Sequence, residues 1–404
     1  MKPLSSPATT PQKALDLSEA TSEGRLPAVL LLAGSCMPVL GAVLLAPVLP
    51  SMTSAFADIP GAQILVPVVL TVPALMIALL APFAGAIADK VGRKMLLLVA
   101  MFVYSIFGTA PLWLDSLPAI LASRVGVGIA EAAIMTVCTT LIADYYSGKQ
   151  RDKYLGMQVL VATLAATAFY ALGGALGSQG WRMPFWLYLA AAIIAVPMAL
   201  VLREPIHRSE DHAKSAVPWR QVAVPSAVTL FGGIVFYALV VQLPYVLSNL
   251  GVTEVGVIGA GTALASLATA AGAFAFRYIS SAGTGRLLPV AFGLAAAGLT
   301  IVAIAGSVPV ALAGAVVTSA GTGLLLPSLL TWALSDLSLE QRGRGTGVWT
   351  GSLYIGQFVS PVALGIAAGA VNGLPIAMGI LGALSAVAAV AVAIARPRQQ
   401  SITV

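Results

Sequence analysis

The sequence predicts an all-α integral membrane protein with twelve transmembrane helices arranged as two pseudo-symmetric six-helix bundles. Three observations predict this class. Hydrophobic residues make up 59% of the 404 residues and charged residues only 9%, whereas about a quarter of an ordinary globular domain is charged. The apolar residues form twelve long runs, and the basic residues gather in alternate gaps between them. The first six runs and the last six also share a weak internal repeat.

Each run is long enough to cross a bilayer, which takes roughly 20 apolar residues in a helix. A transmembrane β-barrel would need alternating apolar and polar residues, and runs such as 65–80 show no such alternation. Helices are therefore the predicted spanning elements. The twelve spans are expected near 27–50, 63–87, 95–114, 118–143, 155–178, 184–202, 221–248, 254–279, 287–306, 309–335, 345–370 and 374–395.

The basic residues predict the orientation of these spans. All but two of the 21 lysines and arginines lie on one side of the predicted spans, in the two tails or at and after the ends of the even-numbered spans. The exceptions are Arg124, inside span four, and Arg182, in a loop on the other side. By the positive-inside rule the basic side is cytoplasmic, so we expect both termini in the cytoplasm, with the chain in the bacterial inner membrane. The net charge of +6 then reflects topology and contact with lipid headgroups, and no nucleic-acid binding is expected.

The polar segments of the chain predict its domain organisation. Residues 1–24 are rich in Ser, Thr and Pro and lack the apolar content to pack, so we expect a disordered cytoplasmic tail. A charged stretch divides the spans six and six. The predicted domains are a first bundle at 25–202, a central cytoplasmic loop at 203–220, a second bundle at 221–396 and a tail at 397–404.

A weak repeat relates the two halves. After span four, an acidic residue, an arginine and a glycine follow one another at Asp144, Arg151 and Gly156. The same order recurs after span ten, from Asp336 to Gly347. Internal duplication of this kind is typical of transporters, whose substrate site lies between the repeats near the middle of the membrane.

The loop after span two contains a specific motif. It reads Gly85-Ala-Ile-Ala-Asp89-Lys-Val-Gly92-Arg93-Lys94. This segment resembles the major facilitator superfamily, whose signature between helices two and three is G-x-x-x-D-x-x-G-R-K/R. The resemblance implies the major facilitator fold. It also implies that these five motif residues form a latch that holds the two halves together on the cytoplasmic side when the cavity faces outward.

The residue types in this motif suggest what each contributes. Gly85 would permit close approach of helices, Gly92 a tight turn, and Asp89 could accept charge-assisted hydrogen bonds. The alternative is that the cations of the loop only anchor it to lipid headgroups. That alternative would explain Arg93 and Lys94 but neither the glycines nor the acid.

Two further segments extend the resemblance. Arg124-Val-Gly-Val-Gly128 is similar to the R-x-x-x-G motif of the family, which in proton-coupled members is associated with proton transfer. Gly173-Gly174 resembles the end of helix five in the drug:proton antiporter branch. That branch usually has Gly-Pro just before the paired glycines, whereas this chain has Phe169-Tyr170-Ala-Leu.

Arg124 and Glu131 are the clear charges inside the spans. Such charges are expensive in lipid and usually face a cavity or a partner. The two residues lie seven positions apart, about two helical turns or roughly 10 Å, so direct pairing is not expected. Our hypothesis is that Glu131 loads and releases a proton as its desolvation changes, while Arg124 modulates its charge or binds a polar or anionic part of the substrate. The alternative is that Glu131 stays protonated as an interhelical hydrogen-bond donor and Arg124 braces backbone carbonyls.

Polar and aromatic residues on four other spans predict a central substrate pocket. An apolar cavity with few polar groups suits amphipathic organic molecules. For each residue, a contact between helices or anchoring at the membrane interface remains an open alternative. The set is Ser35, Gln158, Thr163, Tyr170, Tyr237, Gln242, Tyr245, Trp349, Tyr354 and Gln357.

Other classes of function lack their signatures. The sequence contains no G-x-x-x-x-G-K-[ST] motif, no H-E-x-x-H motif and no intramembrane histidine. We therefore expect no catalytic residues, no metal and no cofactor. The absence of a nucleotide-binding motif predicts transport driven by a gradient. The resemblance, which is nearest to the drug and sugar efflux branches of the family, implies that a monomeric protein exports small hydrophobic or amphipathic compounds in exchange for protons, as in multidrug efflux. The main alternative is proton-coupled uptake of a small metabolite or sugar, and the remote one is a receptor or scaffold that transports nothing.

Overall fold

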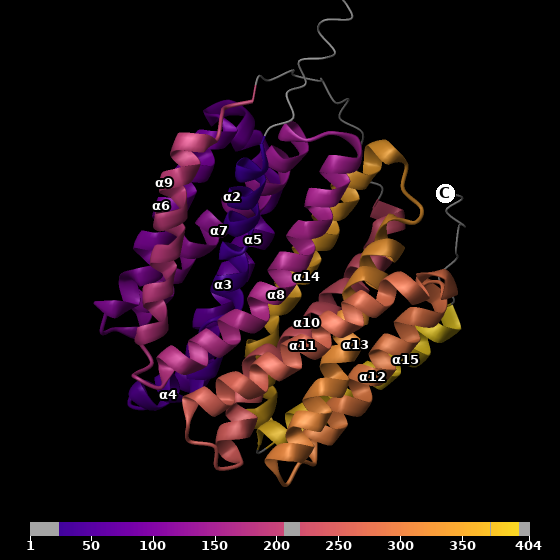
Figure 1. Ribbon diagram of the computed structural model, residues 1–404. Coiled ribbons are helices and arrows are strands. Elements are labelled where there is room, and N and C mark those ends of the chain that lie inside the picture. The colour runs from indigo at the N-terminus through magenta and orange to yellow at the C-terminus, as the bar shows by residue number, and fades with distance from the viewer. Residues whose placement is uncertain (1–23, 206–218, 372, 396–404) are drawn as a thin grey trace, which may run out of the picture.

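The computed structural model describes residues 24–205, 219–371 and 373–395. Regular structure within these ranges is entirely helical, and twelve helical segments are long and apolar enough to cross a membrane (Figure 1). The predicted fold class is thus confirmed, and the predicted spans agree with the observed helices to within about two helical turns. The predicted tail at 397–404 lies outside the described residues, and so do the tail at 1–24 except for Gly24 and the loop at 203–220 except for 203–205 and 219–220.

The first half of the chain forms six spans, of which the first is broken into short segments. In order they are α2 (Arg25–Ser35), α3 (Met37–Val43), η1 (Ala46–Val48) and α4 (Leu49–Ala55) as span one; α5 (Ala62–Val91); α6 (Arg93–Thr109) with η2 (Ala110–Leu112); α7 (Leu117–Tyr145); α8 (Gly148–Gly177); and η3 (Met183–Tyr188) with α9 (Leu189–Val201).

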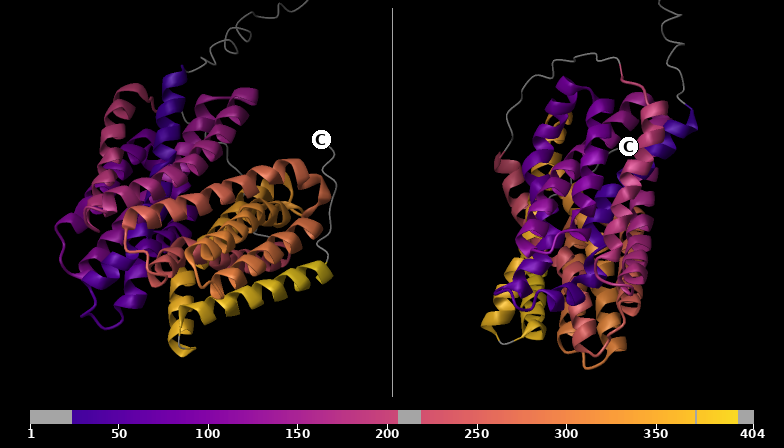
Figure 2. Two further views of the ribbon diagram at one scale, coloured as in Figure 1. Left: turned by 60° about the horizontal axis from the view of Figure 1, so that its bottom comes forward. Right: turned by 90° about the vertical axis from the view of Figure 1, so that its left-hand side faces the viewer.

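The second half forms six longer, mostly continuous helices, several of which run through an internal proline. They are α10 (Trp219–Asn249), α11 (Val255–Ile279) with η4 (Ser280–Ala282), α12 (Thr284–Ala303), α13 (Val308–Leu334), α14 (Leu339–Ala370) and α15 (Leu374–Ala395). Across the two halves, α8 packs on α11 and α5 on α14. Figure 2 shows the yellow α15 along the outer edge of the second half, where it packs on α12.

The apolar side chains divide between the interior and the outer surface. A large buried cluster fills the first half and reaches Tyr237 and Val255 of the second, and two smaller clusters fill the second half. Large apolar side chains also point outward, with Leu200 82% and Ile394 76% exposed. Apolar side chains exposed over so many helices mark a surface that lipid covers, because water would penalise it.

Prolines break the first span. Pro38, Pro47 and Pro50 each stand at the start of a new segment. A proline has no N–H and clashes with the preceding turn, so carbonyl oxygens in this stretch are open to other donors. The Tyr104 hydroxyl on α6 donates to the Met37 carbonyl oxygen at 2.6 Å. The Tyr237 hydroxyl on α10 donates to the Ala42 carbonyl oxygen, also at 2.6 Å. These bonds hold α3 between the two halves.

The halves are in close contact at one end of the bundle. We call the end at which Arg93, Lys149 and Arg203 lie the basic end, and the other the far end. At the far end Thr53 Oγ1 and Tyr245 Oη form a hydrogen bond of 2.8 Å between α4 and α10. The α8 and α11 backbones also meet closely there, since a Cβ added to Gly174 would lie 2.7 Å from the Cα of the facing glycine on α11. The far end is therefore closed.

Candidate functional site

A cavity of about 660 Å³ lies between the two halves. Helices α2, α3, α5, α7 and α8 of the first half and α10, α11, α13 and α14 of the second contribute to its wall. Its lining residue Leu243, toward the far end, is 1% exposed, whereas Val159, toward the basic end, is 68% exposed. The cavity thus opens toward the basic end. Its volume is in the range of sites that bind drug-sized molecules.

Most of the predicted pocket residues line this cavity. The lining is predominantly apolar, as expected, with polar groups distributed over both walls. Glu131 on α7 is part of it. The predicted pocket residues that it brings together are Ser35, Gln158, Thr163, Tyr170, Tyr237, Tyr354 and Gln357.

Three residues of the predicted pocket lie elsewhere. Tyr245 forms the far-end hydrogen bond with Thr53, Gln242 is buried within the second half, and Trp349 has a buried indole N–H without a hydrogen-bond partner. None of the three lines the cavity. Sequence composition could not separate them from the others, because it does not say which face of a wide apolar helix turns toward the second bundle.

The sequence prediction also missed polar residues that do line the cavity. These residues are hydroxyl-bearing side chains on α11 and α13, together with Thr139 of α7. A serine or threonine in a transmembrane helix commonly bonds to its own backbone, so its presence in the sequence is a weak signal for a binding site. The missed hydroxyl residues of the second half are Thr262, Ser266, Thr269, Ser319 and Thr322.

Glu131 lies on the cavity wall and is only 1% exposed. Its Oε1 atom has no hydrogen-bond partner. Oε1 packs against the backbone of α3 at Gly41, where any added Cβ would collide with it. A buried carboxylate oxygen without a partner is costly, whereas a protonated carboxyl group is much less so. The site can therefore hold a proton, although its predicted coupling role stays a prediction.

Arg124 is buried within the first half and does not line the cavity. Its Nη2 donates to the carbonyl oxygens of Phe107 at 2.7 Å and Gly108 at 3.1 Å. Its guanidinium carbon also lies 5.2 and 5.1 Å from the centroids of two aromatic rings of η3. Among the described residues it forms no ion pair, so the expected lack of direct pairing with Glu131 is confirmed. This geometry matches the alternative in which Arg124 braces backbone carbonyls.

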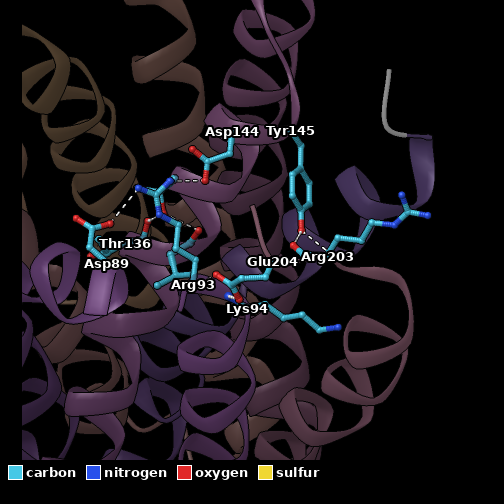
Figure 3. A network of polar contacts seen from close by, with 10 residues as sticks. Asp89, Arg93, Lys94, Thr136, Asp144, Tyr145, Arg203 and Glu204 are labelled. Atoms are coloured by element: carbon cyan, nitrogen blue, oxygen red, sulfur yellow. Dashed lines mark hydrogen bonds and ion pairs between the residues drawn. The ribbon is translucent and has the colours of Figure 1, made fainter. Parts of the chain in front are cut away.

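The motif loop between α5 and α6 forms a polar network at the basic end (Figure 3). Arg93 Nη2 lies 3.0 Å from Asp89 Oδ1, and its Nη1 pairs with Asp144 at the end of α7. The side chain of Arg93 therefore links three helices, α5, α6 and α7. The sequence places Asp144 in the internal repeat, and the structure shows that it also pairs with Arg93.

Glu204, which follows α9, completes the network. Its carboxylate accepts hydrogen bonds from the backbone N–H groups of Arg93 at 2.5 Å and Lys94 at 2.9 Å. A carboxylate at the start of α6 accepts hydrogen bonds from N–H groups that have no partner within the helix. Its negative charge also interacts favourably with the positive end of the helix dipole. The Lys94 ammonium group donates to the Ala199 carbonyl oxygen at 2.8 Å. The hydrogen bonds of Arg93 and Lys94 thus reach the first bundle and the start of the central loop at Glu204, and the latch between the halves stays a prediction.

The two glycines of the motif have different surroundings. Gly92 has a φ of +97°, and a Cβ there would lie 3.2 Å from the Glu204 carboxylate. This confirms the predicted tight turn. At Gly85 an added Cβ would meet no described atom within 4 Å, so the close helix approach predicted there is absent. The reason is that the surface of α5 at Gly85 faces open space.

This contrast gives a test of the motif. Gly92→Ala is expected to destabilise the protein by about 1–3 kcal/mol, because alanine must adopt a backbone conformation that essentially only glycine tolerates. Gly85→Ala is the matched control and should melt at or above the wild-type temperature, since alanine favours a helix. Thermal unfolding of the purified variants in detergent measures both. Equal melting of the two variants would contradict the assignment of Gly92 as a strained turn.

Comparison with known proteins identifies a family. A family model described as Major Facilitator Superfamily matches residues 31–297. Quinolone resistance protein NorA of Staphylococcus aureus (strain N315) is 28% identical over 163 residues, 40% of each chain. Multidrug resistance protein 2 of Bacillus subtilis (strain 168) is 32% identical over 143 residues, 33% of this chain and 34% of the relative. The matched region spans only about 40% of the length of the first of these curated relatives.

Solved structures share the fold over nearly the whole chain. One is the crystal structure of a bacterial homolog to the human lysosomal transporter Spinster, in an inward-facing and unoccupied conformation, with a TM-score of 0.71 at 20% identity, covering 92% of this chain and 95% of that one. Another is a D-xylose-proton symporter, with a TM-score of 0.76 at 14% identity, covering 91% of this chain and 97% of the other. At these identities the likeness concerns the fold.

Proposed function

Because the chain belongs to the Major Facilitator Superfamily, we propose that this multi-pass membrane transporter exports small hydrophobic or amphipathic compounds in exchange for protons. Export proceeds by alternating access, as the first bundle (25–202) and the second (221–396) rock about the central cavity. The basic end faces the cytoplasm of a bacterial inner membrane, with both termini on that side. We propose that the protein works as a monomer, in keeping with a cavity that residues of a single chain line.

The central cavity carries this proposal. It combines a largely apolar wall, a volume suited to drug-sized molecules and one carboxyl group, on Glu131. An intramembrane acid on such a wall can exchange a proton with water when the cavity is open. The names of the relatives from Staphylococcus aureus and Bacillus subtilis, which describe resistance to quinolones and to multiple drugs, support the substrate class and the outward direction.

The motif network takes part in the same cycle. In the conformation described here, Arg93 pairs with Asp89 and Asp144, and Glu204 caps α6. We propose that Gly85, Asp89, Gly92, Arg93 and Lys94 engage the second half when the basic end closes. The anionic and cationic groups of the network are already gathered at one turn of the basic end, which supports a role in its closure.

Transport in membrane vesicles tests the function. Everted vesicles containing the full-length protein, energised to an acidic lumen, are expected to accumulate hydrophobic dyes or antimicrobials, and an uncoupler should release them. Vesicles without the protein are the control. Accumulation in right-side-out vesicles instead would indicate proton-coupled uptake, which the fold also serves in the D-xylose-proton symporter. Flux that ignores the proton gradient in both orientations would contradict the proposal.

A further inference from the structure

Among the described residues, the cavity wall carries an acidic side chain but no basic one. Glu131 is the one carboxyl group among the lining residues, and no lysine, arginine or histidine lines the cavity in the described part of the chain. The nearest cationic side chain on α7, Arg124, is held among carbonyl oxygens and aromatic rings within the first half. In a site of low dielectric, a wall with one acid and no base favours a cationic ligand over an anionic one.

The hydroxyl groups on the first-half wall donate to the protein itself. Ser35 Oγ donates to the Leu31 carbonyl oxygen at 2.8 Å, and Thr163 Oγ1 donates to the carbonyl oxygen of Val159 at 2.8 Å. The amide of Gln158 donates to Ser35 Oγ at 2.7 Å and to a threonine hydroxyl of α7 at 3.1 Å. Each hydroxyl oxygen keeps lone pairs, so this wall presents mainly hydrogen-bond acceptors to a ligand.

The second-half wall follows the same pattern. On α11, Thr262 donates to the Gly259 carbonyl oxygen at 2.9 Å and Thr269 to the Ala265 carbonyl oxygen at 3.3 Å. On α13, Thr322 donates to the Ser319 carbonyl oxygen at 3.1 Å. The hydroxyls of Tyr237 and Tyr354 also donate to the first half. Four lining residues have side-chain donors for which the described structure gives no acceptor. The wall therefore offers some donors, but fewer than acceptors. The four residues are Tyr170, Ser266, Ser319 and Gln357.

We propose that the cavity selects protonated organic amines that retain at least one N–H bond. This inference rests on the proposed function and deepens it by naming the substrate class. Such a cation brings both the charge that Glu131 attracts and hydrogen-bond donors, of which the wall has fewer than acceptors. The carboxyl group and the hydroxyl oxygens accept those N–H bonds, while the apolar wall binds the carbon skeleton. A quaternary ammonium ion has the charge but no donor, and so leaves the buried acceptors without a partner.

A matched set of probes tests the proposal. The probes are dimethyl(2-naphthylmethyl)amine, its N-methyl quaternary salt and 2-naphthylacetate, which share a ring system and differ in charge and donors. Binding to the purified full-length protein in lipid nanodiscs is measured at neutral pH by isothermal titration calorimetry, with empty nanodiscs as the control. We expect the amine to bind about tenfold more tightly than the quaternary salt, the usual value of a charge-assisted hydrogen bond, and the acetate to bind weakest.

Three outcomes would overturn the proposal: equal binding of the amine and the quaternary salt, tighter binding of the acetate, or no binding of the amine. Binding is measured without a proton gradient, so these outcomes are distinct from a failure of the proposed function, which is seen as flux that ignores the gradient. An amine preference therefore supports the inference independently of the direction of transport.

Variants of the second-half wall locate the acceptors. Thr262→Val combined with Thr269→Val removes two acceptor oxygens while keeping the shape, and should lower the ratio of amine to quaternary affinity by about threefold. Thr300→Val on α12 is the matched control, because Thr300 makes the same bond to its own helix, at 2.8 Å to the Ala296 carbonyl oxygen, but does not line the cavity. An unchanged ratio in the double variant, or an equal change in the control, would contradict the assignment.

Discussion

Glu131→Gln is expected to abolish the accumulation of substrate against its gradient, while downhill exchange of substrate continues. Glutamine keeps the shape of the side chain but cannot gain or lose a proton, so the coupling between the two fluxes is lost. The folded protein should be as stable as wild type or more so, because a neutral amide is less costly than a carboxylate at a 1% exposed position. Proteoliposomes with and without an imposed pH gradient measure both fluxes.

The control for Glu131→Gln is Glu254→Gln at the start of α11. This carboxylate is exposed at the far end and does not line the cavity, so its loss removes the same charge without touching the site. Its variant should accumulate substrate as the wild type does. Full accumulation by Glu131→Gln under the pH gradient would exclude Glu131 as the proton carrier and favour the alternative in which it remains a hydrogen-bond donor.

Gly41→Ala is expected to slow transport by about ten- to a hundredfold. An alanine Cβ at this position would collide with Oε1 of Glu131, and overpacking of this kind typically costs about 1–3 kcal/mol. The carboxyl group must then leave its place against α3, which changes its access to protons. Initial rates of substrate flux in proteoliposomes measure the effect. Gly293→Ala on α12, where the added Cβ meets no described atom within 4 Å, is the matched control.

A second substitution can rescue this defect. Glu131→Asp shortens the side chain by one methylene group and so makes room for the alanine Cβ. The double variant Gly41→Ala with Glu131→Asp should therefore transport faster than Gly41→Ala alone. Independent, additive losses in the double variant would mean that Gly41 and Glu131 do not share a steric contact, and wild-type rates for Gly41→Ala would mean that the contact does not matter.

Hydropathy predicted the spans because burial in lipid acts on each residue type separately. A run of about 20 apolar residues crosses a bilayer whatever it packs against. The same local logic located the turn at Gly92 and the intramembrane charges of Arg124 and Glu131. The prediction of close helix packing at Gly85 was wrong, because a glycine in a helix is compatible with both close packing and open space.

The composition of the cavity was only partly predictable. Tyr170 and Tyr237 line it, whereas Tyr245 holds the far end closed, although all three are tyrosines within apolar spans. The difference lies in helix rotation and in the depth at which α10 meets α4. Both depend on contacts between segments nearly 200 positions apart, and a local sequence pattern does not predict such contacts.

The sequence by itself determined that this chain spans a membrane twelve times, which loops are basic, and which residues carry charge into the bilayer. These properties follow from side-chain chemistry and from the length of each run. Only the tertiary structure decided that Gly41 of the broken first span packs on the Glu131 carboxyl group, that Glu204 caps α6, and that Arg124 turns away from the cavity. Each of these depends on two or more helices meeting at a particular rotation, and that rotation is set by packing across the whole bundle.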